Sequence, residues 1–128
     1  MLILYVENDP MNRRVIRSML GVAGVHMDEA ADAQTGLRLV DTGDYALVLM
    51  DLRMPGMSGV EAIKKIRLRN DAKSETPILV VTADISHDIR QTCLAAGAND
   101  LLMKPVTMNV LFKTMGEMIA NHAVRQMH

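Results

Sequence analysis

Short apolar runs alternate along this chain with longer stretches in which apolar residues recur every three or four positions. The runs cover residues 2–6, 25–30, 45–50, 78–81 and 101–103, and the second of them is interrupted by His26, Asp28 and Glu29. Runs of this kind, rich in Val, Ile and Leu, predict strands, and the stretches between them predict amphipathic helices. Five strand–helix pairs in succession predict an α/β domain built on a parallel sheet.

Capping residues mark where the helices should begin and end. Asp9 before Pro10 predicts the start of the first helix, and Ser58 predicts the start of the third. The other helices are expected at 33–41, at 86–96 with Gly97 as the cap, and from 107 to about 121, leaving 122–128 as a short frayed tail. The residues expected to face the core are Met11, Val15, Met19 and Leu20 in the first helix, which Gly21 and Gly24 should end, and Val60, Ile63, Ile66 and Leu68 in the third.

Polar residues follow four of the five apolar runs directly. Glu7, Asn8 and Asp9 follow the first run, Asp51 the third, Thr82 the fourth and Lys104 the fifth. In a parallel sheet these strand ends share one edge, and ligands bind in the crevice outside it. The pattern therefore predicts an acidic cluster, a hydroxyl and a lysine side by side at one edge of the sheet.

The ordered set Glu7-Asn8, Asp51, Met54-Pro55, Thr82-Ala83 and Lys104-Pro105 resembles the receiver domain of two-component response regulators. The resemblance covers essentially the whole chain, with residues 1–121 as the receiver domain and 122–128 as the tail. It implies a flavodoxin-like, doubly wound (βα)5 fold with strand order 2-1-3-4-5. The switch point of that order lies between the first and third strands, beside Asp51.

The chemistry that the resemblance implies is phosphoryl transfer onto Asp51. A carboxylate that attacks phosphorus gives an aspartyl phosphate, and a divalent cation is needed between the two anionic partners. Glu7, Asn8, Asp51 and the backbone carbonyl of Arg53 would hold Mg²⁺, or Mn²⁺ in its place. Lys104 and the Thr82 hydroxyl would bind phosphoryl oxygens, and the family usually has a cis bond between Lys104 and Pro105. Such a chain is no classical enzyme, because it catalyses only the phosphorylation and dephosphorylation of its own aspartate.

Two positions depart from the family pattern. Asn8 stands where receivers usually carry a second acid, so weaker Mg²⁺ binding is expected. Leu101 stands where an aromatic side chain often switches rotamer, so a signal is expected to travel through the loop at residues 82–84 and the helix after it. Arg53 and Asp84 are expected to flank the pocket as an ion pair that gates water access.

Composition narrows the classes of function. The 128 residues fit one domain, and 14 basic against 15 acidic residues give no basic field for nucleic-acid binding. No stretch of about 18 apolar residues and no signal-peptide layout occur, so a cytoplasmic protein outside the membrane is expected. The single cysteine, Cys93, excludes an internal disulfide and is expected to be packed. Most of the 12 methionines are expected to fill the core.

The implied partners are a histidine kinase or histidine phosphotransfer protein and a downstream protein. The downstream protein would bind the face of the fourth helix, fifth strand and fifth helix, with Ile89, Arg90, Met108, Leu111 and Met115 as candidates. A phosphorylation-independent adaptor is an alternative, favoured by Asn8 and Leu101. A flavodoxin-fold enzyme or nucleotide binder is disfavoured, because no glycine-rich phosphate loop follows the first strand. Residues 7–13 resemble receivers of hybrid kinases, so a receiver excised from such a kinase also remains open.

Overall fold

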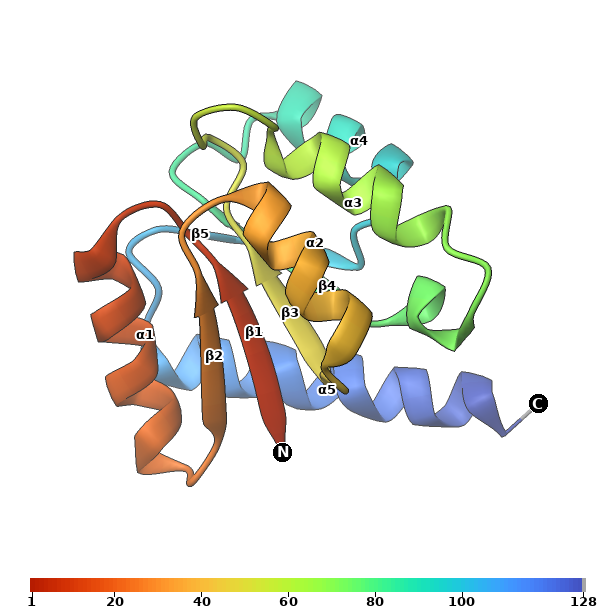
Figure 1. Cartoon of the computed structure of the whole chain (residues 1–128). Coiled ribbons are helices and arrows are strands. Elements are labelled where there is room, and N and C mark those ends of the chain that lie inside the picture. Colours follow the sequence, from red (N-terminus) through yellow and green to blue (C-terminus); the bar gives the residue numbers. More distant parts are fainter. Residues whose placement is uncertain (128) are drawn as a thin grey trace.

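The computed structural model describes residues 1–127 and contains one sheet of five parallel strands (Figure 1). The strands are β1 (Leu2–Val6), β2 (His26–Ala30), β3 (Leu47–Met50), β4 (Ile78–Thr82) and β5 (Asp100–Met103). Their order is β2-β1-β3-β4-β5, and each neighbouring pair is parallel. The predicted flavodoxin-like fold and strand order are therefore confirmed.

Helices cover both faces of this sheet (Figure 1). They are α1 (Pro10–Val22), α2 (Ala33–Thr42), α3 (Gly59–Arg67), α4 (His87–Ala96) and α5 (Met108–Gln126), with a 3₁₀ helix η1 (Ala72–Glu75) before β4. α1 and α5 pack on one face, and α2, α3 and α4 pack on the other. Since both faces are covered, all residues of β3 and β4 are buried, which is why these strands read as unbroken apolar runs.

Successive strand residues point to opposite faces of the sheet. In β1, Ile3 and Tyr5 join the core under α1 and α5, whereas Leu4 and Val6 join the core under the other three helices. Cys93 lies in the second of these cores and is fully buried, as predicted. Five of the methionines are buried, namely Met27, Met50, Met54, Met115 and Met118.

Most of the predicted caps are confirmed. The side chains of Asp9 and Ser58 accept hydrogen bonds from the backbone N–H groups of Met11 and Glu61. Gly97 ends α4 with φ of 118°, a left-handed conformation that glycine adopts without strain. Ser86 stands at the N-cap of α4 but makes no capping hydrogen bond with its side chain.

Several details of the helix predictions were wrong. Met11 and Val15 are exposed, because the buried face of α1 is formed by Ile16 and Leu20. Leu68 follows the last turn of α3 and is 79% exposed. Gly21 lies inside α1, whose chain turns only at Gly24.

The last helix is longer than predicted. α5 continues through residues 122–126, which were expected to fray, and Gln126 donates a side-chain hydrogen bond to Glu75 at 2.9 Å. His128 lies outside the described residues. None of the helices in residues 1–127 combines the length and the apolar character needed to cross a membrane.

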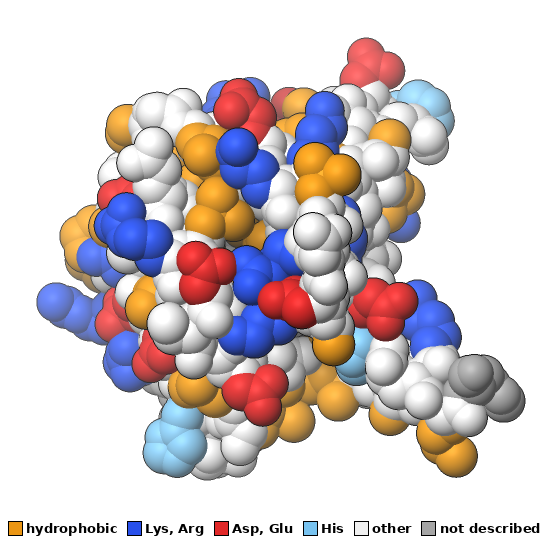
Figure 2. All heavy atoms as spheres, turned by 45° about the vertical axis from the view of Figure 1, so that its right-hand side comes forward, with side chains coloured by type: hydrophobic (Ala, Val, Ile, Leu, Met, Phe, Trp, Pro, Cys, Tyr) orange, Lys and Arg blue, Asp and Glu red, His pale blue; other side chains and the backbone are white. Residues whose placement is uncertain are grey.

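Charges of both signs are mixed on the face that lies to the right in Figure 1. Figure 2 shows Lys and Arg side chains next to Asp and Glu side chains over this face. Arg69 forms ion pairs with Asp41 and Asp71. These pairs, together with two hydrogen bonds from Lys73 to backbone carbonyls of residues 40 and 41, join the end of α2 to the segment between α3 and β4.

Candidate functional site

Three of the predicted site residues directly follow a strand, and their backbone N–H groups still form hydrogen bonds with the neighbouring strand. The Glu7 N–H donates to the Ala30 carbonyl at 2.9 Å, and the Asp51 N–H donates to the Val6 carbonyl at 3.0 Å. The Lys104 N–H donates to the Thr82 carbonyl at 2.8 Å. These bonds hold the polar residues at the carboxyl edge of the sheet, where the alternation of the sequence predicted them.

The side chains of Glu7, Asp51 and Lys104 meet at this edge. Lys104 Nζ lies 2.7 Å from Glu7 Oε1 and 3.4 Å from Asp51 Oδ1. Glu7 is only 1% exposed and Asp51 only 7%. Two buried carboxylates therefore share one ammonium group, and the three formal charges sum to −1.

Burial is the main reason why the pKa of Asp51 is raised to about 6, and a hydrogen bond and the charge of Glu7 add to it. Burial also acts to raise the pKa of Glu7, but hydrogen bonds with Asp51, Lys104 and Asn12 outweigh it and leave this pKa below its ordinary value. Asp51 is therefore the first of the two carboxyl groups to take a proton. Burial opposes the charge of Lys104, yet Glu7 and Asp51 together raise its pKa.

We expect Asp51→Asn to stabilise the metal-free domain. Because the folded protein binds a proton at Asp51 more tightly than the unfolded chain, the wild type loses stability as the pH rises from about 4 through the folded pKa of about 6. The variant escapes this loss, so it should be more stable by on the order of 1–3 kcal/mol at pH 7.5 and by much less at pH 4.5. Urea denaturation in EDTA at both pH values measures the difference.

The exposed Asp44 offers a matched control for this prediction. Asp44→Asn should change the free energy of unfolding by no more than about 0.5 kcal/mol at either pH. A lower stability of Asp51→Asn than of wild type at pH 7.5 would contradict the prediction.

Further donors surround Glu7, and no motif in the sequence marks them as part of the site. Asn12 Nδ2 donates to Glu7 Oε1 at 2.7 Å, and the Tyr5 hydroxyl reaches the same oxygen at 3.4 Å. Arg13 Nη1 donates to the backbone carbonyls of Glu7 at 2.6 Å and Asn8 at 3.1 Å. As the third residue of α1, Asn12 is placed to reach back over the start of the helix, but the sequence does not show which group it reaches.

Thr82 and Asn8, the other two side chains predicted at the site, lie close to this cluster without hydrogen bonding to it. Thr82 is buried, and its hydroxyl oxygen accepts the Asp84 N–H at 3.3 Å. Asn8 is exposed, and its Nδ2 donates to the Ala31 carbonyl at 3.5 Å. The peptide bond between Lys104 and Pro105 is cis.

The predicted ion pair of Arg53 and Asp84 is present, with 3.7 Å between Arg53 Nη2 and Asp84 Oδ2. The two side chains are 83% and 42% exposed, so the pair adds little stability. Leu101 is buried in the core under α4, and an aliphatic side chain there has no ring to rotate.

The donor set fits a divalent cation. Glu7 and Asp51 present two carboxylates that interact with each other, and hard oxygen ligands of this kind suit Mg²⁺. Within residues 1–127 no group of three or more Asp, Glu, His or Cys is placed to hold a metal. Asp9 does not add a third carboxylate, because its side chain caps α1.

Of the five candidates for an output surface, two are excluded by burial. Leu111 and Met115 are 0% and 4% exposed and pack in the core between α5 and the sheet. Arg90 is exposed, and its Nη2 lies 3.7 Å from Asp100 Oδ1. Ile89 and Met108 are partly buried.

Comparison with known protein families gives one match over most of the chain. The family model described as "Response regulator receiver domain" matches residues 3–115. Among curated proteins, the transcriptional regulatory protein HprR of Escherichia coli K12 is 32% identical over 122 residues, which are 95% of this chain and 53% of HprR. The sensor histidine kinase RcsC of the same strain is 33% identical over 115 residues, which are 90% of this chain and 12% of RcsC. This chain thus spans about half or less of the length of these relatives.

Solved structures superpose on almost the whole chain. The receiver domain of the sensor histidine kinase PA1611 from Pseudomonas aeruginosa PAO1 gives a TM-score of 0.85 at 34% identity, covering 93% of this chain and 97% of the other. That structure is described with a magnesium ion coordinated in its active-site cleft. The chemotaxis protein CheY4 of Vibrio cholerae gives a TM-score of 0.86 at 29% identity, covering 91% of this chain and 97% of the other.

Proposed function

Since the chain belongs to the response regulator receiver domain family, we propose that it accepts a phosphoryl group from a phosphohistidine onto Asp51. The observation that supports this proposal is the buried carboxylate of Asp51, which ends a central strand and lies 3.4 Å from Lys104 Nζ. An anionic nucleophile beside a fixed cation suits attack on an anionic phosphorus centre. The state of Asp51 would then be passed on through contacts with another protein.

In the proposed reaction, an oxygen of Asp51 forms a bond to phosphorus while the bond from phosphorus to the histidine nitrogen breaks. The electron pair of the broken bond stays on the imidazole, which takes up a proton. Lys104 exchanges its contacts with Glu7 and Asp51 for one with a phosphoryl oxygen, and the Thr82 hydroxyl donates to another. Neither residue has to transfer a proton.

A bound Mg²⁺ would neutralise negative charge on the phosphoryl oxygens and on Asp51. Glu7, Asp51, the Asn8 side chain and the backbone carbonyl of Arg53 are the groups proposed to hold it, and Mn²⁺ is an alternative ion. The Asn8 Nδ2 group already donates to Ala31, which leaves its Oδ1 as the oxygen available for a metal. PA1611, whose receiver domain is 34% identical, supports this assignment of the cleft.

The proposed function predicts a covalent adduct on Asp51. Wild-type protein incubated with Mg²⁺ and phosphoramidate should gain the mass of one phosphoryl group, and Asp51→Asn should gain none, because it lacks the nucleophile. Intact-mass spectrometry measures both. An adduct of equal yield in Asp51→Asn would overturn the assignment of Asp51.

The neutral Asn8 predicts weak binding of Mg²⁺. With Glu7 and Asp51 as the only ionised side-chain ligands, Asn8→Asp should lower the Mg²⁺ dissociation constant by about tenfold, since it restores a charged oxygen ligand. Amide chemical shifts recorded during a Mg²⁺ titration measure the constant. Asn70→Asp, which makes the same change at an exposed position, is the matched control and should bind Mg²⁺ like wild type. Equal affinity of wild type and Asn8→Asp would contradict the prediction.

A phosphorylation-independent adaptor is the second candidate function. It is favoured by the exposed Asn8, which leaves two carboxylates at the cleft, and by the buried Leu101. An adaptor of this kind would bind its partner equally well as wild type and as Asp51→Asn. If wild type forms no adduct and Asn8→Asp does, the adaptor becomes the better description.

The remaining proposals concern the setting of the domain. We place it in the cytoplasm, with residues 1–121 as the receiver domain and residues 122–128 as a short tail, into which α5 continues as far as Gln126. A histidine kinase or phosphotransfer protein would supply the phosphoryl group. The downstream protein would bind the face of α4, β5 and α5, where Arg90 is exposed and Met108 is partly exposed.

A further inference from the structure

Asn12 is the residue next to Glu7 that the proposed reaction leaves without a role. Its Nδ2 lies 2.7 Å from Glu7 Oε1, the same distance as Lys104 Nζ from that oxygen. The Tyr5 hydroxyl is farther away, at 3.4 Å. All three donors contact the same oxygen of the Glu7 carboxylate, Oε1.

The position of Asn12 is fixed by the way α1 begins. The Asp9 cap and Pro10 set the first turn, which makes Asn12 the third residue of the helix and turns its side chain back toward the end of β1. Asn12 is partly buried rather than free in solvent. A short amide held by a capped helix is a rigid donor.

Arg13 fixes the backbone on which Glu7 stands. Its Nη1 bonds the carbonyls of Glu7 and Asn8, and its Nε lies 3.1 Å from Glu29 Oε1. Arg17 holds the other oxygen of Glu29, with Nη2 at 2.6 Å. Arg13 thus holds the backbone of Glu7 and Asn8 in the loop between β1 and α1, and Asn12 holds the side-chain carboxylate of Glu7.

We propose that Asn12 is a positioning residue of the phosphoryl-transfer site, which holds the Glu7 carboxylate in place when Lys104 leaves it. This inference rests on the proposed function, in which Lys104 turns from the carboxylates to a phosphoryl oxygen. At that moment Glu7 loses one of its two close donors, and Asn12 is the one that remains. Groups that orient a metal-binding carboxylate in this way commonly contribute a substantial factor to metal affinity.

The test removes the donor while keeping the size of the side chain. Asn12→Leu should raise the Mg²⁺ dissociation constant, measured from amide chemical shifts, by about tenfold. The Mg²⁺ concentration that gives half the maximal rate of phosphorylation by phosphoramidate should rise by the same factor. Ser18→Leu, an exposed position on the same helix, is the matched control and should bind Mg²⁺ like wild type.

A second comparison separates positioning from a general effect on α1. In a Lys104→Met background Asn12 is the only close donor to Glu7, so Asn12→Leu should raise the Mg²⁺ dissociation constant by a larger factor there than in wild type. If Leu at position 12 prevents folding, Asn12→Ala is measured in its place. A Mg²⁺ dissociation constant unchanged by loss of the amide in both backgrounds would overturn the inference.

Failure of the proposed function and failure of the role assigned to Asn12 would give different results. If wild type binds Mg²⁺ but forms no adduct, the proposed function fails, and the binding measurements still decide the role of Asn12. If wild type forms the adduct and Asn12→Leu matches it in Mg²⁺ affinity and in the Mg²⁺ dependence of the rate, only the role of Asn12 is lost.

Discussion

Gly59→Ala is expected to lower the free energy of unfolding by about 3 kcal/mol or more and to abolish phosphorylation of Asp51. A Cβ atom on Gly59 would overlap the backbone carbonyl oxygen of Asp51 and lie 2.9 Å from Leu52 Cα. The Gly59 N–H also donates to the Leu52 carbonyl at 3.0 Å, so the two backbones approach each other directly. Backbone atoms cannot give way as a flexible side chain can, and the start of α3 or the Asp51 loop must shift.

The sign of the change in unfolding free energy distinguishes a steric clash at Gly59 from the general effect of replacing a helical glycine with alanine. In an open helix position Gly→Ala stabilises by about 0.5–1 kcal/mol. Gly116 lies inside α5 with no atom within 4 Å of the added Cβ, so Gly116→Ala should be more stable than wild type. Urea denaturation of both variants, and intact mass after phosphoramidate treatment well below the melting temperature, make the comparison. A gain in stability for Gly59→Ala, or a normal adduct, would contradict the expectation.

The fold was predictable because the apolar runs and the helix-capping residues both indicated the same alternation of strands and helices. The apolar runs gave strands, and the caps at Asp9 and Ser58 gave helix starts that the structure confirms. The ends and buried faces of the helices could not be predicted fully, because they depend on tertiary contacts. The last turn of α5 is one example: Gln126 bonds Glu75, a residue 51 positions earlier in the chain, and no local signal announces such a contact. Met11 and Val15 are another, since the rotation of α1 against the sheet decides which apolar residues are buried.

The candidate site was predictable only in part. Residues that end strands, such as Asp51 and Lys104, could be placed because parallel strand ends share an edge. Asn12 and Arg13 could not be given partners, because their side chains reach back over the loop from α1 to Glu7 and Asn8. Their contacts depend on the direction of the helix, which the cap fixes in space and which apolar periodicity does not reveal.

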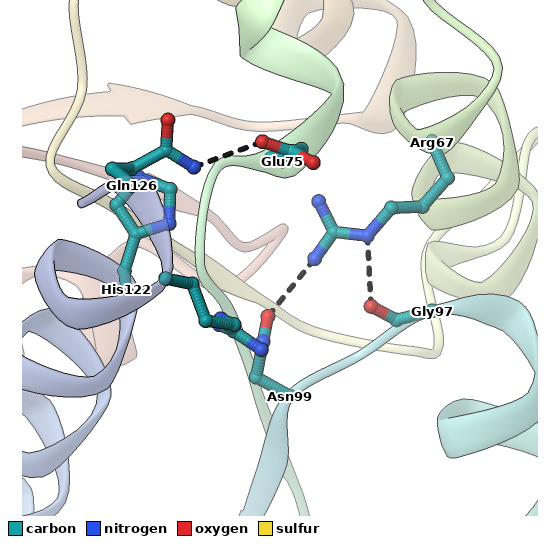
Figure 3. Close-up of a pocket in the computed structure, with 7 residues that line it drawn as sticks. Arg67, Glu75, Gly97, Asn99, His122 and Gln126 are labelled. Atoms are coloured by element: carbon teal, nitrogen blue, oxygen red, sulfur yellow. Dashed lines mark hydrogen bonds between the residues drawn. The ribbon is translucent and has the colours of Figure 1, made fainter. Parts of the chain in front are cut away.

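Arg67→Met is expected to destabilise the domain by about 2–5 kcal/mol while leaving the rate of Asp51 phosphorylation unchanged below the melting temperature. Arg67 ends α3, and Figure 3 shows its guanidinium pointing toward Gly97 and Asn99. Nε donates to the Gly97 carbonyl at 2.9 Å, and Nη2 donates to Asn99 Oδ1 at 2.9 Å. Nη1 donates to the carbonyls of Ser74 and Thr76 at 2.8 and 2.7 Å. Loss of these bonds leaves four acceptors without their donors in the segments that lead into β4 and β5.

Position 67 requires a side chain with several N–H donors that point in different directions, which the planar guanidinium group of arginine provides. A single ammonium cannot serve four acceptors spread over two segments, so Arg67→Lys should lose most of the same stability. Lys64→Met, at an exposed position of the same helix, should stay within about 0.5 kcal/mol of wild type. Urea denaturation of the three variants measures these differences, and wild-type stability of Arg67→Met would contradict them.

The two ends of α3 therefore carry different requirements. At Gly59 the helix touches the backbone of Asp51, so a change there should alter both stability and phosphorylation. At Arg67, the last of the nine residues of α3, the helix binds the opposite edge of the sheet, where β4 and β5 begin. Because that edge contains none of the residues proposed to bind Mg²⁺ or the phosphoryl group, stability and phosphorylation should separate in Arg67→Met. A phosphorylation rate that fell in the folded variant would show that α3 transmits a displacement along its whole length.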